Sequence, residues 1–207
     1  MKKPLPIRTL FLDVGGVLLT NGWDHLARKR AAKHFKLNWA DMDERHRLVF
    51  ETHEEGRLTF AEYLNCVVFY EKRAFTRNQF RDFLFAQSKP YPKMIQLIID
   101  LKAKYGLRIV VVSNESREVN AHRISAFKLD QLADTFMSSC FVQMRKPDVR
   151  IFRLALDLAQ TPPAQAIFLD NTPMFVQIAE DLGIHGILHV DYESTRSKLA
   201  SFGLGTD

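Results

Sequence analysis

Two carboxylates, Asp13 and Asp170, each close a short apolar run of the sequence. The two runs, in residues 7–13 and 166–170, are bounded by turn residues, which is the pattern of buried strands. Parallel strands of an open α/β sheet end at a common edge, and such sheets bind their ligands there. Two carboxylates that meet at this edge could hold Mg²⁺, which takes one or two carboxylates together with water and phosphate oxygens.

A hydroxyl, an amine and two glycines could complete an anion-binding site around these acids. Ser113 follows the apolar run 107–112, and its hydroxyl and the next backbone N–H could hold a phosphate oxygen; alternatively, Ser113 caps the following helix. Lys146, which precedes a proline, could neutralise a nucleophile and a phosphate together, or could lie in a surface turn. Gly15 and Gly16 would let the backbone approach a bound ion or anion closely.

The elements that must position these groups alternate along the chain. Apolar residues recur at helical spacing from Met94 to Tyr105, and Gly106 provides a C-terminal stop. Asp148 and Pro173 are suited to begin two further helices. Such alternation predicts an α/β fold with a Rossmann-like, three-layer parallel sheet. The predicted strands are residues 7–13, 107–112, 166–170 and 186–190.

The segment after the first predicted strand has a different pattern, with no convincing strand. Thr59 with Glu62, and Thr76 with Gln79, match the capping box that begins a helix. Apolar and aromatic stripes at helical spacing favour a bundle core, so about four helices are expected, placed to roof the site. The predicted division is a core domain formed by residues 1–20 and 90–207 and a helical cap domain formed by residues 21–89.

The composition narrows the classes of protein that fit. The chain has 207 residues and 46% hydrophobic content, enough for one core and a small accessory lobe. Its net charge of +5 is mixed with acidic residues, so we expect no nucleic-acid partner. No apolar stretch reaches the roughly 20 residues that span a bilayer, so we expect no membrane association. Two cysteines do not make a disulfide framework, which fits a cytoplasmic protein.

Taken in order, these segments resemble the haloacid dehalogenase-like superfamily. The resemblance covers nearly the whole sequence, including a helical cap inserted after the first motif. Within the superfamily, the chain is similar to the branch of sugar-phosphate phosphatases and epoxide hydrolase N-terminal phosphatases. The four family motifs correspond here to Asp13-Val14-Gly15-Gly16-Val17, Ser113-Asn114, Lys146-Pro147 and Asp170-Asn171.

The resemblance implies a role for each motif residue. Asp13 would be the nucleophile that forms an aspartyl-phosphate, and Lys146 would balance the charge. Mg²⁺ would be held by Asp13, the backbone carbonyl of Gly15 and Asp170. The substrate would be a small phosphorylated metabolite, and the residues expected to bind it are Ser113, Asn114, Gly16 and Trp23.

Two positions depart from the family pattern. Phosphatases of this family carry a second Asp two residues after the nucleophile as general acid and base, and Gly15 stands there. Because general acid–base catalysis contributes about 10²–10⁴-fold, this loss predicts a slower enzyme or one restricted to good leaving groups. Asn171 replaces another Asp and weakens the predicted metal site, where Glu115 could reach the metal or a water. Asp24 and His25 are further candidates for the missing acid, although Asp24 is also a good helix N-cap.

Three functions from different classes remain open at this point. The retained motif residues favour an Mg²⁺-dependent phosphohydrolase of a small phosphomonoester, with a sugar phosphate as the candidate. The replacements at Gly15 and Asn171 favour a binding or regulatory protein that keeps the fold. A metal-free haloacid dehalogenase is disfavoured by the charge of Asp170 beside the nucleophile.

We expect a monomer or a homodimer. The other histidines show no metal-ligand spacing and are interpreted as surface or core residues: His34, His46, His53, His122, His185 and His189.

Overall fold

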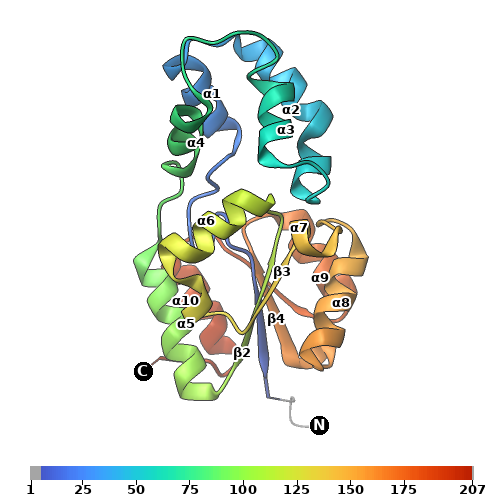
Figure 1. The fold of residues 1–207 in the computed structure, drawn as a ribbon. Helices are drawn as coiled ribbons and strands as arrows, with labels where there is room; N and C mark the ends of the chain where they lie inside the picture. The colour runs from blue at the N-terminus through green and yellow to red at the C-terminus, as the bar shows by residue number, and fades with distance from the viewer. Residues whose placement is uncertain (1–5, 207) are drawn as a thin grey trace.

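A five-stranded parallel sheet forms the centre of the computed structural model, which describes residues 6–206 (Figure 1). The strands lie in the order β3-β2-β1-β4-β5, so that the first strand of the chain is central. Phe11 of β1 is in register with Val110 of β2 and with Phe168 of β4. The strands are β1 Thr9–Leu12, β2 Arg108–Ser113, β3 Thr135–Ser138, β4 Ala166–Asp170 and β5 His185–Leu188.

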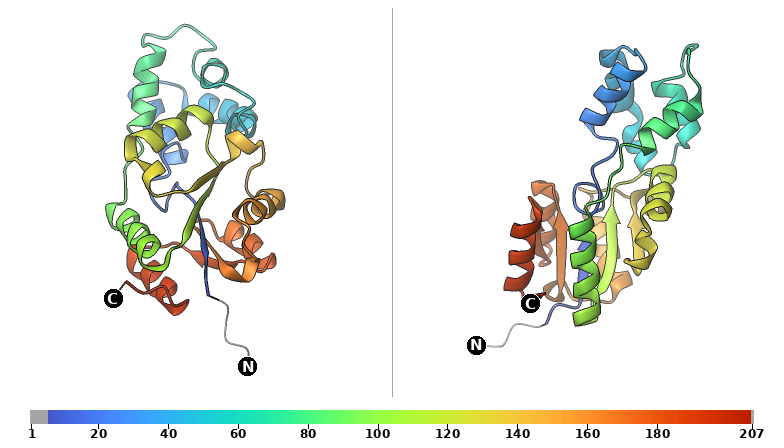
Figure 2. Two further views of the ribbon diagram at one scale, coloured as in Figure 1. Left: turned by 60° about the horizontal axis from the view of Figure 1, so that its bottom comes forward. Right: turned by 90° about the vertical axis from the view of Figure 1, so that its left-hand side faces the viewer.

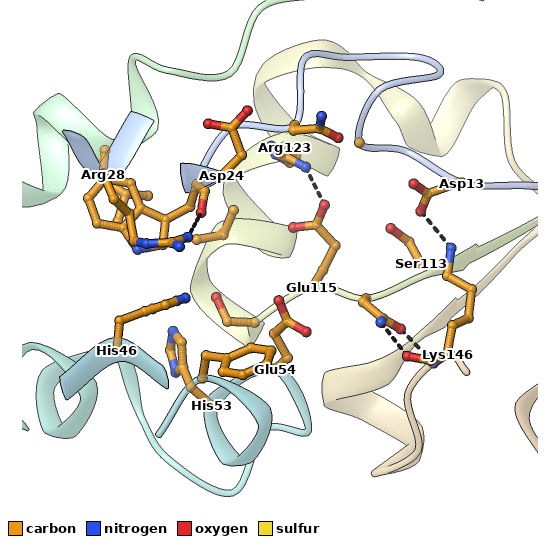
Figure 3. Close-up of a pocket in the computed structure, with 18 of the residues that line it drawn as sticks. Asp13, Asp24, Arg28, His46, His53, Glu54, Ser113, Glu115, Arg123 and Lys146 are labelled. Atoms are coloured by element: carbon orange, nitrogen blue, oxygen red, sulfur yellow. Dashed lines mark hydrogen bonds and ion pairs between the residues drawn. The ribbon is translucent and has the colours of Figure 1, made fainter. Parts of the chain in front are cut away.

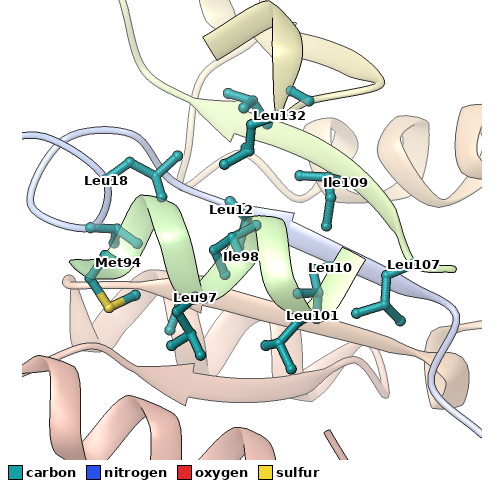
Figure 4. Packing of buried hydrophobic residues seen from close by; sticks show 14 of the residues in the cluster. Leu10, Leu12, Leu18, Met94, Leu97, Ile98, Leu101, Leu107, Ile109 and Leu132 are labelled. Atoms are coloured by element: carbon teal, nitrogen blue, oxygen red, sulfur yellow. The ribbon is translucent and has the colours of Figure 1, made fainter. Parts of the chain in front are cut away.

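Helices cover both faces of the sheet, as predicted for a three-layer α/β fold. Leu10 and Leu12 pack in a cluster with α5 and α10, whereas Phe11 between them packs with α8 and α9 (Figures 1 and 4). Because both faces are buried, the central strands are apolar at nearly every position. The helices of this part are α5 Pro92–Tyr105, α6 Arg117–Phe127, α7 Ser139–Val142, α8 Val149–Ala159, α9 Pro173–Asp181 and α10 Tyr192–Ser201.

One strand, β3, was not predicted from the sequence. It has four residues, lies at the edge of the sheet, and is only partly buried over its first two positions. Its sequence, Thr-Phe-Met-Ser, follows a 3₁₀ turn at Leu129–Gln131 and lacks the continuous apolar run of the central strands. Pairing with β2, with Val112 in register with Met137, therefore decides its conformation more than its own pattern does.

The segment after β1 forms the four expected helices (Figures 1 and 2). Both predicted capping boxes are present, from Thr59 to Glu62 and from Thr76 to Gln79. A cluster of buried aromatic and aliphatic side chains holds the four helices together, with Tyr63 and Phe80 fully buried in it. The helices are α1 His25–His34, α2 Trp39–Glu54, α3 Phe60–Val67 and α4 Arg77–Phe85.

Two chain segments connect this helical cap to the sheet, and they run side by side. Thr20 N donates to Lys89 O at 2.8 Å, and Leu19 forms a bridge with Pro90. The predicted boundaries, after residues 20 and 89, fall in these two connections. The division into a core domain and a helical cap domain stays a prediction.

The C-terminal end of α2, in the cap, packs against the core beside the edge of the sheet where the strands end. Ser139 Oγ donates to the backbone carbonyl of Glu54 at 2.6 Å, and Arg145 pairs with Glu51 at 2.9 Å and Glu54 at 3.0 Å. Gly56 lies against the backbone of Cys140, because a Cβ at Gly56 would lie only 2.4 Å from the carbonyl oxygen of Cys140. These contacts hold the C-terminal end of α2 over the sheet edge where the predicted motif residues meet.

Candidate active site

Two buried carboxylates and one buried amine meet where β1 and β4 end. Leu12 is in register with Leu169, so that the following residues of each strand bring Asp13 next to Asp170. Lys146 Nζ lies 3.0 Å from Asp13 Oδ1 and 2.5 Å from Asp170 Oδ2, and the lysine side chain is only 1% exposed. Burial alone would lower the pKa of Lys146, but the two carboxylates raise it above its ordinary value. The ammonium group therefore stays charged between them.

Asn114 fixes the position of this lysine. Its side-chain Nδ2 donates to the carbonyl of Lys146 at 2.8 Å, and its Oδ1 accepts from the Lys146 N–H at 2.8 Å. Asn114 was predicted to bind substrate, and the structure shows its amide engaged with the backbone of Lys146. Ser113 is buried at the end of β2 and lines the cavity beside Asp13 (Figure 3). Ser116, and not Ser113, occupies the N-cap position of α6, so the alternative that Ser113 caps that helix is wrong.

The loop after Asp13 needs its two glycines for different reasons. Gly16 has φ +76°, and a Cβ there would lie 2.0 Å from Asn171 Nδ2, so only glycine fits. This contact places the Asn171 side chain against the loop. A Cβ at Gly15 would lie 3.3 Å from Asn21 Oδ1 and 3.7 Å from Arg123 Nη1. The space that a side chain at position 15 would enter is thus bordered by a buried guanidinium group.

Arg123 links that space to a carboxylate from the next strand end. It is 2% exposed, and its Nη1 donates to Glu115 Oε1, its Nε to Ser88 Oγ at 3.0 Å and its Nη2 to Thr20 O at 3.1 Å. Burial raises the pKa of Glu115 to about 7, and the guanidinium of Arg123 offsets only part of this effect. The negative charge of Asp13 adds to the increase. The side chain of Glu115 pairs through Oε1 with Arg123, which had no predicted role. That Glu115 could reach a metal or a water stays a prediction.

The cap closes the site from above and leaves a cavity of about 400 Å³ (Figure 3). Trp23, predicted to contact substrate, lines the cavity and donates from Nε1 to Tyr63 Oη at 2.8 Å. Asp24 also lines it and is the N-cap of α1, with Oδ1 2.7 Å from Ala27 N. His25 is not among the lining residues; its side chain is half exposed.

Two histidines of the cap, His46 and His53, line this cavity, although their spacing in the sequence is not that of metal ligands. His46 and His53 lie seven residues apart on α2, and this spacing of two helical turns puts them on one face. This spacing is the feature of the sequence that could have related the two histidines to each other. It indicates a shared site only once this face of α2 is known to line the cavity, which depends on how the cap packs against the core.

The oxygen donors near Asp13 fit a magnesium ion. The candidate ligands are the carboxylates of Asp13 and Asp170 and the backbone carbonyl of Gly15, and all of them are hard oxygen ligands. Within residues 6–206, no group of three or more His, Cys, Asp or Glu side chains is arranged to hold a metal. Mg²⁺ needs no such group, because it keeps several waters and takes only one or two carboxylates, whereas structural zinc takes four protein ligands.

The chain is similar in sequence to an epoxide hydrolase and to a phosphatase. It is 32% identical over 113 residues to bifunctional epoxide hydrolase 2 of Sus scrofa; the match covers 53% of this chain and 20% of that protein, so the chain spans only a small part of that relative. It is 26% identical over 176 residues to glyceraldehyde 3-phosphate phosphatase of Methanothermobacter thermautotrophicus, covering 80% of this chain and 77% of that protein.

A solved structure shares the fold. A haloacid dehalogenase (HAD) family enzyme of Bacteroides thetaiotaomicron, in complex with magnesium and inorganic phosphate, superposes with a TM-score of 0.74 at 20% identity, covering 89% of this chain and 94% of that one. The capped parallel sheet with acids at its carboxyl edge agrees with a sequence match to the haloacid dehalogenase-like hydrolases over residues 7–195. Because this match spans most of the chain and both its sheet and its cap, the protein belongs to the haloacid dehalogenase-like hydrolases.

Proposed function

We propose that the chain is an Mg²⁺-dependent phosphohydrolase that cleaves a small phosphomonoester through an aspartyl-phosphate on Asp13. The observation that carries the proposal is the buried group of Asp13, Lys146 and Asp170 at the base of a capped cavity. The cavity of about 400 Å³ is of a size that small metabolites occupy. The similarity to a glyceraldehyde 3-phosphate phosphatase supports a small phosphorylated substrate.

In the first step, a carboxylate oxygen of Asp13 forms a bond to phosphorus, and the bond from phosphorus to the ester oxygen breaks. Lys146, held by Asn114 and paired with Asp170, lies 3.0 Å from the nucleophile and would offset the charge of the phosphoryl group. The hydroxyl of Ser113 would bind a phosphoryl oxygen from the adjacent strand end. Asp13 and Asp170 would hold Mg²⁺, which would supply positive charge that offsets the charge of the transferring phosphoryl group.

Glu115 supplies and recovers the proton in this proposal. The leaving alcohol oxygen takes the proton of Glu115 as the ester bond breaks. In the second step, water attacks phosphorus, the bond to Asp13 breaks, and Glu115 takes the proton of that water. A carboxyl with a pKa near the working pH is suited to both transfers.

The surroundings of Glu115 support this role. Its Oε1 is bonded to the same Arg123 Nη1 that lies 3.7 Å from the place of a Cβ on Gly15. The carboxyl therefore lies close to the space where relatives with Asp two residues after the nucleophile would place their acid. Both Glu115 and Asp13 line the same cavity (Figure 3).

Hydrolysis of a panel of sugar phosphates, polyol phosphates and an aryl phosphate tests the proposal, with Mg²⁺ and with a chelator. We expect turnover that the chelator stops and that Asp13→Asn lowers to background. A folded protein with no turnover above the Asp13→Asn variant on any substrate would refute the phosphohydrolase proposal and favour a binding protein.

A further inference from the structure

The face of α2 that looks into the cavity carries two buried imidazoles that the proposed reaction does not use. His46 is 8% exposed and His53 is 5% exposed, and both line the cavity that also reaches Asp13 (Figure 3). In the described part of the chain, each ring has one nitrogen bonded to the protein, its Nδ1. The Nε2 atoms are thus the ones left for a ligand.

The hydrogen bonds of Tyr63 assign the proton of His46. Tyr63 Oη accepts the indole N–H of Trp23 at 2.8 Å, because indole nitrogen is a donor only. The buried hydroxyl proton of Tyr63 then has His46 Nδ1, at 2.8 Å, as its acceptor. Burial lowers the pKa of His46 to about 3, so the ring is neutral. A neutral ring that accepts at Nδ1 carries its proton on Nε2 and donates from there.

His53 carries its proton on the other ring nitrogen, Nδ1. Its Nδ1 lies 3.2 Å from the carbonyl of Leu58, which can only accept, so Nδ1 carries the proton. Burial lowers the pKa of His53, which keeps the ring neutral. Its Nε2 is therefore an acceptor. The cavity wall thus has one donor, Nε2–H of His46, and one acceptor, Nε2 of His53. In each ring, the hydrogen bond at Nδ1 determines which nitrogen carries the proton.

Two cations of this wall, Arg28 and Arg47, share one carboxylate. Arg28 Nη2 lies 3.3 Å from Asp43 Oδ1, and Arg47 Nε lies 3.8 Å from Asp43 Oδ2. Arg28 Nη1 also donates to the carbonyl of Trp23 at 3.0 Å. Asp43 offsets only one of these two positive charges, whereas the two imidazoles of the wall are neutral. A hydroxyl group, which both donates and accepts, matches the donor and the acceptor of these two rings.

We propose that His46 and His53 select substrates whose organic part carries hydroxyl groups, with His46 Nε2–H donating to a hydroxyl oxygen and His53 Nε2 accepting a hydroxyl proton. This inference rests on the proposed function, since it places the phosphoryl group at Asp13 and the hydroxylated part under the cap. The ligand class is a phosphate monoester of a polyol or small sugar. The ring faces of Trp23 and Phe50, which line the same cavity, would contact its carbon chain.

The test compares polyol phosphates with alkyl phosphates of equal carbon number: glycerol 3-phosphate with propyl phosphate, and sorbitol 6-phosphate with hexyl phosphate. We expect kcat/KM at least tenfold higher for the polyol member of at least one pair. His46→Leu and His53→Leu should each remove most of that preference, measured as the ratio of kcat/KM between the polyol and alkyl members of a pair. His46→Gln, which retains an N–H donor, should recover part of the preference.

Binding separates this inference from the proposed function. Affinities of the same four esters for Asp13→Asn in Mg²⁺, measured by calorimetry, should show the same preference without turnover. Equal affinity for polyol and alkyl members, with the wild type active, would overturn the selectivity while leaving the phosphohydrolase intact. Preferential binding without wild-type turnover would uphold the selectivity and refute the hydrolase. Histidine ¹⁵N shifts provide a direct check: a proton on Nδ1 of His46 or on Nε2 of His53 would overturn the assignment.

Discussion

Glu115→Gln should slow the hydrolysis of alkyl phosphates far more than that of 4-nitrophenyl phosphate. The amide keeps the size of the side chain and an oxygen that can accept from Arg123, but it holds no proton that can be transferred. A lost general acid typically costs about 10²–10⁴-fold in rate, or roughly 3–5 kcal/mol of transition-state stabilisation. A 4-nitrophenolate ion leaves without a proton, so its ester should lose less than about tenfold.

The pKa of Glu115 sets the expected pH dependence. Because burial raises it to about 7, roughly half of the molecules carry the proton at pH 7 and about one in eleven at pH 8. The value of kcat/KM, which reports the steps through phosphoryl transfer to Asp13, should therefore fall about fivefold between pH 7 and pH 8 for an alkyl phosphate. Glu115→Gln should show no such fall, and the ratio of the two enzymes cancels the titration of the substrate.

A second cavity carboxylate provides the matched control. Glu54 lines the same cavity, and burial raises its pKa, but its carboxylate is paired with Arg145. Glu54→Gln should leave the contrast between alkyl and aryl leaving groups unchanged. Equal losses on both esters in Glu115→Gln, or a leaving-group effect that appears in Glu54→Gln instead, would refute the assignment of the acid to Glu115.

Other perturbations follow from the same geometry. Asp13→Asn should remove turnover by at least about 10³-fold without loss of fold, because an amide does not attack phosphorus; steady-state rates and far-ultraviolet circular dichroism check this. Lys146→Met leaves two buried carboxylates without their cation and should lower the free energy of unfolding by about 3–5 kcal/mol, with part of it restored by Mg²⁺, in urea titrations with and without the ion. Between pH 7 and pH 5 the unfolded state takes up a proton at His46 that the folded state, with its pKa of about 3, does not, so stability falls as the pH falls. This term should make the wild type lose about 2 kcal/mol more than His46→Gln over that interval, measured by urea unfolding at both pH values.

The sequence predicted the fold and the residues of the strand ends because these depend on local pattern. Apolar runs closed by Asp13 and Asp170 needed only the rule that parallel strands end at one edge. The edge strand β3 was missed, since its four residues owe their conformation to pairing with β2. Asn114 follows β2 at the edge of the sheet, as expected. Its hydrogen-bond partner could not be predicted, because the backbone of Lys146 is 32 residues away in the chain.

The residues of the cap wall could not be predicted in the same way. His46 and His53 are related by helical spacing, but their roles depend on Tyr63 and Leu58, which fix the two ring protons from other parts of the cap. Which ring nitrogen carries the proton depends on the hydrogen-bond network around it and cannot be predicted from a sequence motif. The spacing of histidines was considered only for metal ligation, and that criterion does not identify histidines that would donate or accept a single hydrogen bond.

Gly15 and Glu115 are best understood together. A glycine two residues after the nucleophile, considered alone, indicates a missing acid. In the fold, the space beside Gly15 is bordered by Arg123, and Arg123 holds the carboxyl of Glu115 from the neighbouring strand end. An Asp introduced at position 15 would therefore not simply restore the family pattern, because its carboxylate would compete with Glu115 for the same guanidinium. In the proposed function, the departure at one motif and the buried acid after the next are two parts of one arrangement, in which the proton donor lies at the end of the second strand and not of the first.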